Sequence, residues 1–138
     1  MTQLTPANAE RLRNAFLQCR DMEGTLREQL EAYAAAGREI FPAYGEAVDR
    51  LVERVSQNGG GENAPRPGDP MPPFMLPDDS GKLVTLNSLI AKGPAAVMFY
   101  RGHWCPYCRL NVLAVIQAMN RIKAMGAQVV AIMPELQE

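Results

Sequence analysis

Apolar residues recur every three or four positions through the first third of the chain, a spacing that predicts helix. This first stripe consists of Leu12, Phe16, Cys19, Leu26, Leu30 and Tyr33. Thr5 followed by Pro6 is typical of a helix start, because a threonine side chain caps free N–H groups and proline fits the first turn. Glu23 interrupts the stripe beside Gly24. We expect one helix from Thr5 that Gly37 ends or kinks.

A second apolar stripe begins after Phe41–Pro42, where the residue before proline disfavours helical angles. Its members are Tyr44, Val48, Leu51 and Val55. Two amphipathic helices cannot bury both of their apolar faces alone. We therefore predict that residues 1–57 form a helical extension that packs on the rest of the chain or on a second copy. Homodimerisation through these helices is its candidate role.

Residues 58–67 interrupt the periodicity with glycine and proline. Asn58-Gly59-Gly60-Gly61 and Ala64-Pro65-Arg66-Pro67 offer little to bury, and such composition is typical of a linker. The pattern indicates a boundary between the helical extension and a second domain over residues 68–138.

The second domain opens with short apolar runs of strand character. Residues 74–76 and 82–86 flank the turn residues 77–81, a pattern that predicts two strands joined by a turn. Residues 86–90 are expected to form a short helix or turn.

A longer alternation follows. The near-continuous apolar run 94–100 predicts a strand covered on both faces. Residues 106–123 have helical periodicity closed by Gly126, and the apolar run 127–133 predicts another strand. Strand, helix and strand predict a βαβ unit with parallel strands. The fold class is therefore α/β, with a βαβ core that is incomplete where the sequence stops at Glu138.

Composition narrows the possible functions. The chain has 138 residues, 47% of them apolar and 21% charged, as in ordinary globular proteins. A net charge of −1 provides no basic surface for nucleic acid. No apolar run reaches the roughly 20 residues of a membrane span, and the amino terminus lacks the regions of a signal peptide. Three cysteines are too few for a disulfide framework. We expect a cytoplasmic protein without membrane or nucleic-acid partners.

The chemistry concentrates in Cys105-Pro106-Tyr107-Cys108, between a strand and a helix start. Helix N-termini carry partial positive charge and unpaired N–H groups, which stabilise the reactive thiolate. In this arrangement the first sulfur, Cys105, is expected to be exposed. Cys108 is expected to lie deeper and to resolve a bond formed on Cys105. We predict that both cysteines are catalytic.

Five neighbours are candidates for supporting roles. Arg101, His103 and Arg109 would lower a thiol pKa if they point at the sulfurs. Trp104 would offer an apolar docking surface, and Pro106 would stiffen the turn. Tyr100 and Tyr107 are interpreted as packing residues.

Two other interpretations of the cysteines are less favoured. A zinc site formed by both cysteines and His103 would have three ligands, and no second Cys/His pair follows. We therefore predict no metal and no cofactor. Cys19 lies on an apolar helix stripe, where core packing or interface burial outweighs a redox role.

Three segments resemble the alkyl hydroperoxide reductase/thiol-specific antioxidant family, the peroxiredoxins. They are Pro67-Gly68-Asp69-Pro70-Met71-Pro72-Pro73-Phe74-Met75-Leu76-Pro77-Asp78, Gly81-Lys82-Leu83-Val84-Thr85-Leu86 and Phe99-Tyr100-Arg101-Gly102-His103-Trp104-Cys105-Pro106-Tyr107-Cys108. The resemblance is greatest to a peroxiredoxin-like subgroup with a Cys-x-x-Cys motif. It implies a thioredoxin-like fold and reduction of hydroperoxides with electrons from a thioredoxin-like dithiol.

The two motifs in this stretch differ over which sulfur attacks first. Aligned on Phe99-Tyr100, the family's proline falls at Arg101, its Thr/Ser at Cys105 and its peroxide-attacking cysteine at Cys108. The thioredoxin-type motif, Trp104-Cys105-Pro106-x-Cys108, makes Cys105 the attacking thiol instead. Both assignments stay open on the sequence.

The leading hypothesis is a thiol-based antioxidant oxidoreductase that reduces hydroperoxides through a Cys105–Cys108 dithiol/disulfide cycle. One alternative is a thioredoxin-like protein dithiol–disulfide oxidoreductase, for which a protein disulfide is the substrate. The other is a non-catalytic helical assembly module.

Overall fold

The computed structural model describes residues 4–134, and the chain divides into two compact units, Met1–Ala64 and Pro65–Glu138. The amino-terminal residues before Leu4, which bear on a signal peptide, lie outside the described part. So do the residues after Pro134, on which the expectation of an incomplete sheet partly rests. No helix within residues 4–134 is long and apolar enough to cross a membrane.

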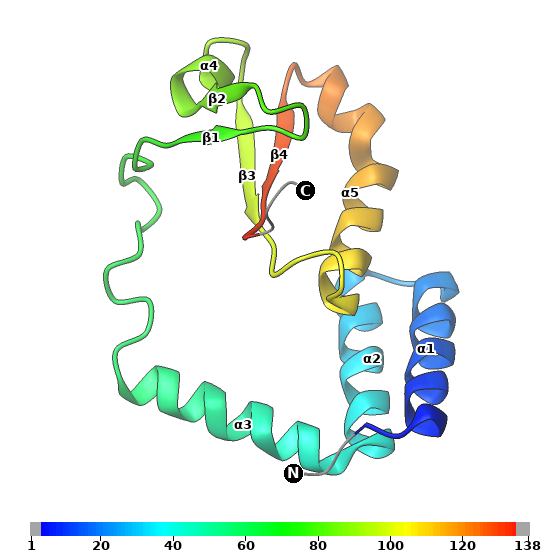
Figure 1. The fold of residues 1–138 in the computed structure, drawn as a ribbon. Coiled ribbons are helices and arrows are strands. Elements are labelled where there is room, and N and C mark those ends of the chain that lie inside the picture. Colours follow the sequence, from blue (N-terminus) through cyan, green and yellow to red (C-terminus); the bar gives the residue numbers. More distant parts are fainter. Residues whose placement is uncertain (1–3, 135–138) are drawn as a thin grey trace. The chain divides into compact units, whose positions relative to one another are not determined.

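The first unit contains α1 (Pro6–Asp21), α2 (Leu26–Ile40) and α3 (Pro42–Gln57) (Figure 1). The start of α1 is as predicted, since Thr5 Oγ1 accepts a hydrogen bond of 3.2 Å from the Asn8 N–H. The single long helix expected after Thr5 is wrong, because the first helix ends at Asp21 and a second one begins at Leu26. Gly24 has a φ of +145°, which only glycine adopts easily.

The restart at α2 is a capping box. Thr25 Oγ1 accepts from the Glu28 N–H, and the Glu28 carboxylate accepts from the Thr25 N–H at 2.7 Å. Each side chain satisfies a backbone donor that the helix leaves unpaired. The prediction that Gly37 ends the helix is also wrong, because α2 continues through Gly37 to Ile40.

The core of the first unit lies on α1 and α2. Phe16 and Tyr33 meet edge to face with ring centroids 6.1 Å apart, and both side chains are buried. Cys19 is buried as well, and burial raises the pKa of its thiol. A bidentate ion pair between Arg38 and Asp49, with N···O distances of 2.6 and 2.8 Å, joins α2 to α3.

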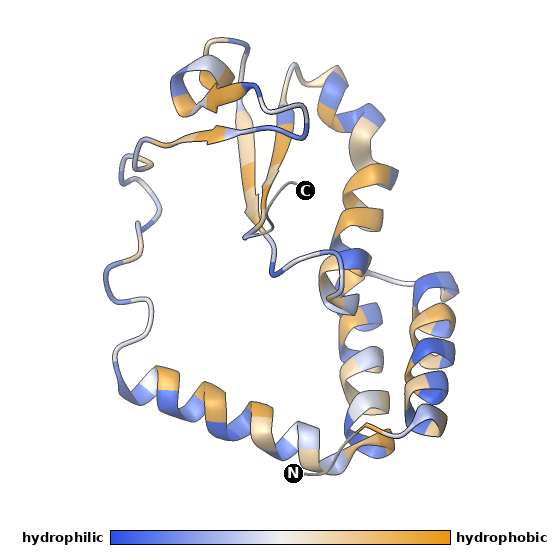
Figure 2. Ribbon diagram, viewed as in Figure 1, coloured by the Kyte–Doolittle hydropathy of each residue, from blue (hydrophilic) through white to orange (hydrophobic). Residues whose placement is uncertain are grey.

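The apolar stripe of α3 is exposed. Its exposed large side chains are Tyr44, Leu51, Val52 and Val55. Figure 2 shows hydrophobic and hydrophilic segments alternating along α3, as expected for an amphipathic helix. The stripe is therefore a surface of the first unit, not part of its core.

In the second unit, β1 (Met75–Pro77) and β2 (Leu83–Thr85) pair antiparallel, as the sequence predicts. The Asp78 carboxylate holds the turn between them, accepting hydrogen bonds from the backbone N–H groups of Ser80 and Lys82 at 2.9 Å each. The short helix α4 (Leu86–Ile90) follows directly and is capped by Thr85, whose Oγ1 accepts from the Ser88 N–H.

The βαβ unit is confirmed. β3 (Ala95–Phe99) and β4 (Gln128–Ile132) pair in parallel, and α5 (Pro106–Ala124) connects them. Ala95 lies opposite Gln128, and Phe99 opposite Ile132. The expected cover on both faces of β3 is absent, since Phe99 is 70% exposed. Within residues 4–134, β3 has β4 as its single strand partner, so no larger sheet surrounds it.

Backbone contacts at Gly93 join the end of α4 to the start of β4. Gly93 has a φ of +130°, and a Cβ there would clash with the carbonyl oxygen of Gly126. Beside this contact, the Gln128 N–H donates to the Pro94 oxygen at 2.9 Å, and its side-chain amide donates to the Leu89 oxygen at 2.6 Å. This junction aligns β3 with β4 and so positions the turn that follows β3.

Candidate active site

The dithiol lies between the end of β3 and the start of α5. The Tyr100 N–H donates to the Ile132 oxygen at 2.9 Å and extends the strand pairing by one residue. A turn over residues 101–104 then leads to Cys105, the N-cap of α5, and Pro106 occupies its first turn as predicted. The chain therefore presents the dithiol at a helix N-terminus, where the helix dipole favours negative charge.

The Cys105 sulfur is covered and surrounded by donors. Its side chain is 0% exposed. Cys105 Sγ accepts from the Cys108 backbone N–H at 3.4 Å and from Arg101 Nη2 at 3.0 Å. A backbone N–H of the helix N-terminus and a guanidinium therefore both donate to one sulfur atom.

These contacts oppose the effect of burial. Burial acts to raise the pKa of Cys105, but hydrogen bonds from the backbone and thiol of Cys108, then the hydrogen bond and charge of Arg101, outweigh it. The net result is a lowered pKa, because each of these groups favours the thiolate. The contacts on Cys105 Sγ therefore favour the thiolate form of this residue.

Cys108 is more exposed than Cys105. Its side chain is half-buried, whereas that of Cys105 is fully covered. Cys108 Sγ accepts from the Arg101 backbone N–H at 3.4 Å. The expectation of an exposed Cys105 and a deeper Cys108 is therefore wrong. The reason is that Cys105 is the N-cap of α5, so its sulfur contacts the Cys108 N–H of the first helical turn and the Arg101 guanidinium.

Arg101 also contacts Trp104. Its guanidinium carbon lies 5.3 Å from the centroid of the Trp104 ring, and Trp104 is 61% exposed. This cation–π contact restricts the long arginine side chain. Of the three predicted cations, Arg101 is thus placed on the thiols. His103 and Arg109 are exposed in the turn and in the first turn of α5, and their supporting roles stay predictions.

The tyrosines pack, as interpreted from the sequence. Tyr100 is buried, and its hydroxyl donates to Met98 Sδ at 3.4 Å. Burial, followed by the charge of Cys108, raises the pKa of Tyr100, so its hydroxyl keeps its proton. Tyr107 is half-buried.

The sequence predicts N–H donors at the start of the helix, but it does not indicate which N–H reaches which sulfur, nor that the Arg101 N–H, before the helix, is one of them. The N–H groups of Arg101 and Cys108 each point to a sulfur. Such donors leave no residue signature, and cysteine is not among the preferred N-cap residues. The turn-then-proline pattern located the helix start but did not indicate which side chain caps it.

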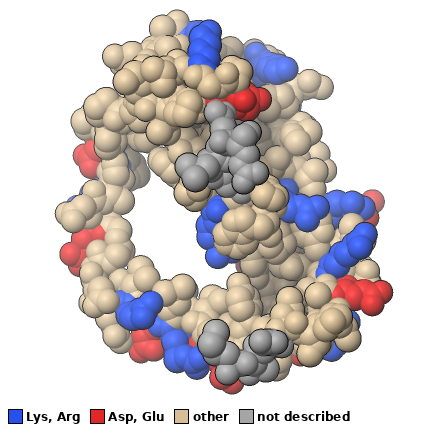
Figure 3. Space-filling view, in the orientation of Figure 1, with Lys and Arg blue, Asp and Glu red and all other residues tan. Residues whose placement is uncertain are grey.

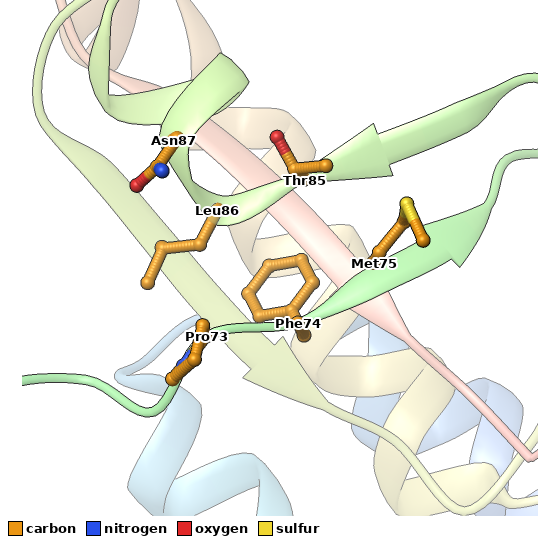
Figure 4. A pocket seen from close by; sticks show the side chains of 6 residues that line it. All are labelled: Pro73, Phe74, Met75, Thr85, Leu86 and Asn87. Atoms are coloured by element: carbon orange, nitrogen blue, oxygen red, sulfur yellow. The ribbon is translucent and has the colours of Figure 1, made fainter.

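An open pocket of about 370 Å³ lies at the hairpin, outside the dithiol (Figure 4). Its lining residues are Pro73, Phe74, Met75, Thr85, Leu86 and Asn87. Thr85 Oγ1 is used as the cap of α4, and none of the six lining side chains is a thiol or a carboxylate. The pocket therefore contributes no redox or acid–base group.

Within residues 4–134, no cluster of three or more His, Cys, Asp or Glu side chains is arranged to hold a metal ion. On the face in Figure 3, Lys and Arg are dispersed among acidic and uncharged residues.

One protein family matches the part of the chain that carries the dithiol. The model of the AhpC/TSA family matches residues 67–138, just over half of the chain. Neither a curated protein nor a solved structure matches the chain significantly. The match covers the hairpin, the βαβ unit and the dithiol, which are the elements that the sequence resemblance identifies. The chain therefore belongs to the AhpC/TSA family, whose members carry out thiol-based redox chemistry on a thioredoxin-like fold.

Proposed function

We propose that the protein reduces hydroperoxides through a Cys105–Cys108 dithiol/disulfide cycle. The observation that carries the proposal is the contact of Arg101 with Cys105 Sγ at 3.0 Å at the N-terminus of α5. It stabilises a thiolate next to a second thiol, and a thiolate is the form that attacks peroxides. Family membership supports the same chemistry.

The cycle has three balanced steps. One cysteine sulfur attacks the peroxide, becomes a sulfenic acid and releases an alcohol or water. The second thiol condenses with the sulfenic acid, forming the Cys105–Cys108 disulfide and releasing water. An external dithiol of the thioredoxin type then reduces the disulfide and is itself oxidised. Such transient, catalytic disulfides are typical of the cytoplasm, where we propose that the protein acts.

The neighbouring residues divide the supporting work. Arg101 supplies positive charge to the thiolate, and Trp104 restricts Arg101 through the cation–π contact. Pro106 fixes the first turn of α5, on which the cap depends. His103 and Arg109 are proposed to add positive potential at the mouth of the site. No cofactor enters this scheme.

The test is consumption of hydrogen peroxide by the whole protein in the presence of thioredoxin, its reductase and NADPH. We expect turnover that is abolished in the double variant Cys105→Ser/Cys108→Ser. Circular dichroism of the variant checks that the helices remain. A wild-type rate no higher than that of the double variant would refute the proposal.

Exposure of Trp104 favours a second candidate function. A large apolar side chain that is 61% exposed beside a dithiol suits docking of a protein substrate. In this alternative the protein reduces protein disulfides. Reduction of insulin without turnover of peroxide would select it over the first proposal.

We also propose homodimerisation through the exposed stripe of α3. Tyr44, Leu51 and Val55 form an apolar surface on the first unit, and a second copy would bury two such stripes against each other. Sedimentation of the whole chain tests this, with Leu51→Glu/Val55→Glu compared with the exposed polar change Gln57→Glu. If the wild-type chain sediments as a monomer at micromolar concentration, the proposed dimer is refuted.

A further inference from the structure

We infer that Cys108, and not Cys105, is the sulfur that exchanges with external thiols. In the reductive half of the cycle the incoming dithiol forms its mixed disulfide with Cys108, and Cys105 departs as the thiolate. This order is the reverse of the one expected from the position of the two cysteines in a Cys-x-x-Cys motif. The inference rests on the proposed dithiol cycle.

Access is the first argument. The side chain of Cys105 is 0% exposed, so an external sulfur has no approach to it in the described arrangement. Cys108, one helical turn later, is half-buried. Thiol–disulfide exchange requires three sulfur atoms to come nearly into line, so its rate depends on which sulfur the attacking thiol can reach.

The departing sulfur is the second argument. Exchange is faster when the leaving thiolate is more stable. Cys105 Sγ receives the Cys108 N–H at 3.4 Å and Arg101 Nη2 at 3.0 Å. Cys108 Sγ receives the backbone N–H of Arg101 at 3.4 Å. The charged donor therefore lies on Cys105, which is the better leaving group of the two.

The direction of the shift in the Cys105 pKa agrees with this geometry. Burial opposes ionisation of Cys105, but the contacts of Cys108 and Arg101 lower its pKa overall. A buried thiolate with matched donors is a poor nucleophile toward a bulky partner and a good leaving group. Cys108 has the access that Cys105 lacks.

The exchange balances as follows. A donor thiolate attacks Cys108 Sγ in the oxidised protein, and a donor–Cys108 bond forms as the Cys105–Cys108 bond breaks. The electron pair of the broken bond stays on Cys105. The second donor thiolate then attacks the donor's own sulfur in the mixed disulfide, and Cys108 leaves and takes up a proton. Two electrons pass from the donor dithiol to the protein.

Glutathione disulfide is a suitable probe, because it reports exchange without peroxide. The variants Cys105→Ser and Cys108→Ser are each incubated with it, and peptide mass spectrometry gives the rate of glutathione addition at the remaining motif cysteine. We expect Cys108 in the first variant to react at least about tenfold faster than Cys105 in the second. Equal rates, or a faster Cys105, would overturn the inference.

A second measurement avoids the substitutions. The reduced wild-type protein receives a short pulse of iodoacetamide below one equivalent, and the labelled cysteines are mapped. We expect label on Cys108 well before Cys105, whereas preferential labelling of Cys105 would overturn the inference. Both measurements are independent of peroxide turnover. A protein that exchanges at Cys108 without consuming peroxide would refute the proposed function and support this inference.

Discussion

Arg101 Nη2 lies 3.0 Å from Cys105 Sγ, while the backbone N–H of the same arginine lies 3.4 Å from Cys108 Sγ. One residue therefore contacts both sulfurs of the dithiol, the first through its charge and the second through its main chain. Because Arg101 comes from the turn directly before the motif, the stabilising charge and the thiols belong to one short segment. The reactivity of the dithiol should depend on this arginine.

Replacing Arg101 by methionine should raise the pKa of Cys105. In the wild type that pKa is lowered, so the two proteins should differ between the lowered value and the ordinary thiol range near 8.5. At a pH above the ordinary thiol range, Cys105 is a thiolate in both proteins. At a pH well below the lowered pKa, it is a thiol in both. The thiolate absorbance near 240 nm, followed against pH, measures the difference. Arg121→Met, at the far end of α5, is the control and should leave the titration unchanged.

The same pKa shift has a consequence for stability. Because the folded state binds the Cys105 proton less tightly than the unfolded state, its contribution is fully present above the ordinary thiol pKa. It is lost as the pH falls through the lowered pKa of the folded state. An Arg101→Met titration that coincides with the wild type would contradict the role given to Arg101.

Replacing Trp104 by leucine should have a smaller effect in the same direction. Cation–π contacts at exposed sites contribute about 0.5–1 kcal/mol, so the pKa of Cys105 should rise less than in Arg101→Met. Trp104 is the one tryptophan in the sequence, so the fluorescence of the wild type should titrate with Cys105. Fluorescence that is indifferent to pH while the 240 nm absorbance changes would show that Trp104 does not sense Arg101.

Replacing Gly37 by alanine should stabilise the first unit. Gly37 lies inside α2, and a Cβ there would meet nothing within 4 Å. Alanine in a helix interior is favoured over glycine by about 0.5–1 kcal/mol. Urea unfolding followed by circular dichroism should show this gain. A loss of stability would indicate that the open space beside Gly37 is filled in solution, for example by a second copy.

Replacing Gly93 by alanine should destabilise the second unit. Its φ of +130° and the clash with the Gly126 oxygen both exclude a side chain, so the loss should be at least about 1 kcal/mol. A lower midpoint in the urea unfolding of the second unit is the expected result. Gly93→Ala with an unchanged midpoint would mean that the junction between α4 and β4 is looser than described.

The strand and helix order of the second unit could be predicted because its signals are local. Turn residues at 77–81, proline at 106 and glycine at 126 each mark a boundary of an element. The break between α1 and α2 was not predicted, although Thr25 and Glu28 form a capping box. Apolar residues at helical spacing lie on both sides of this break, so periodicity alone suggests one helix that is only interrupted at Glu23.

The site was predicted in its residues but not in its geometry. The Cys-x-x-Cys spacing identified both sulfurs, and the residues on either side of it included three candidate cations. Which cysteine is buried depends on which residue caps α5. That in turn depends on the backbone angles at Cys105, which the residue types do not predict. Exposure of Phe99 was missed for a related reason, since a pattern of apolar residues does not tell how many strands surround a strand.

The most direct test of the dithiol cycle is a thiol count after a single turnover. The reduced protein, with three free cysteines within residues 4–134, receives one equivalent of hydrogen peroxide without any reductant. The account predicts rapid loss of two thiols, retention of the Cys19 thiol, and one tryptic species in which Cys105 and Cys108 are joined. Slow thiol loss at the rate of free cysteine, or disulfides that link Cys19 or separate chains, would contradict it.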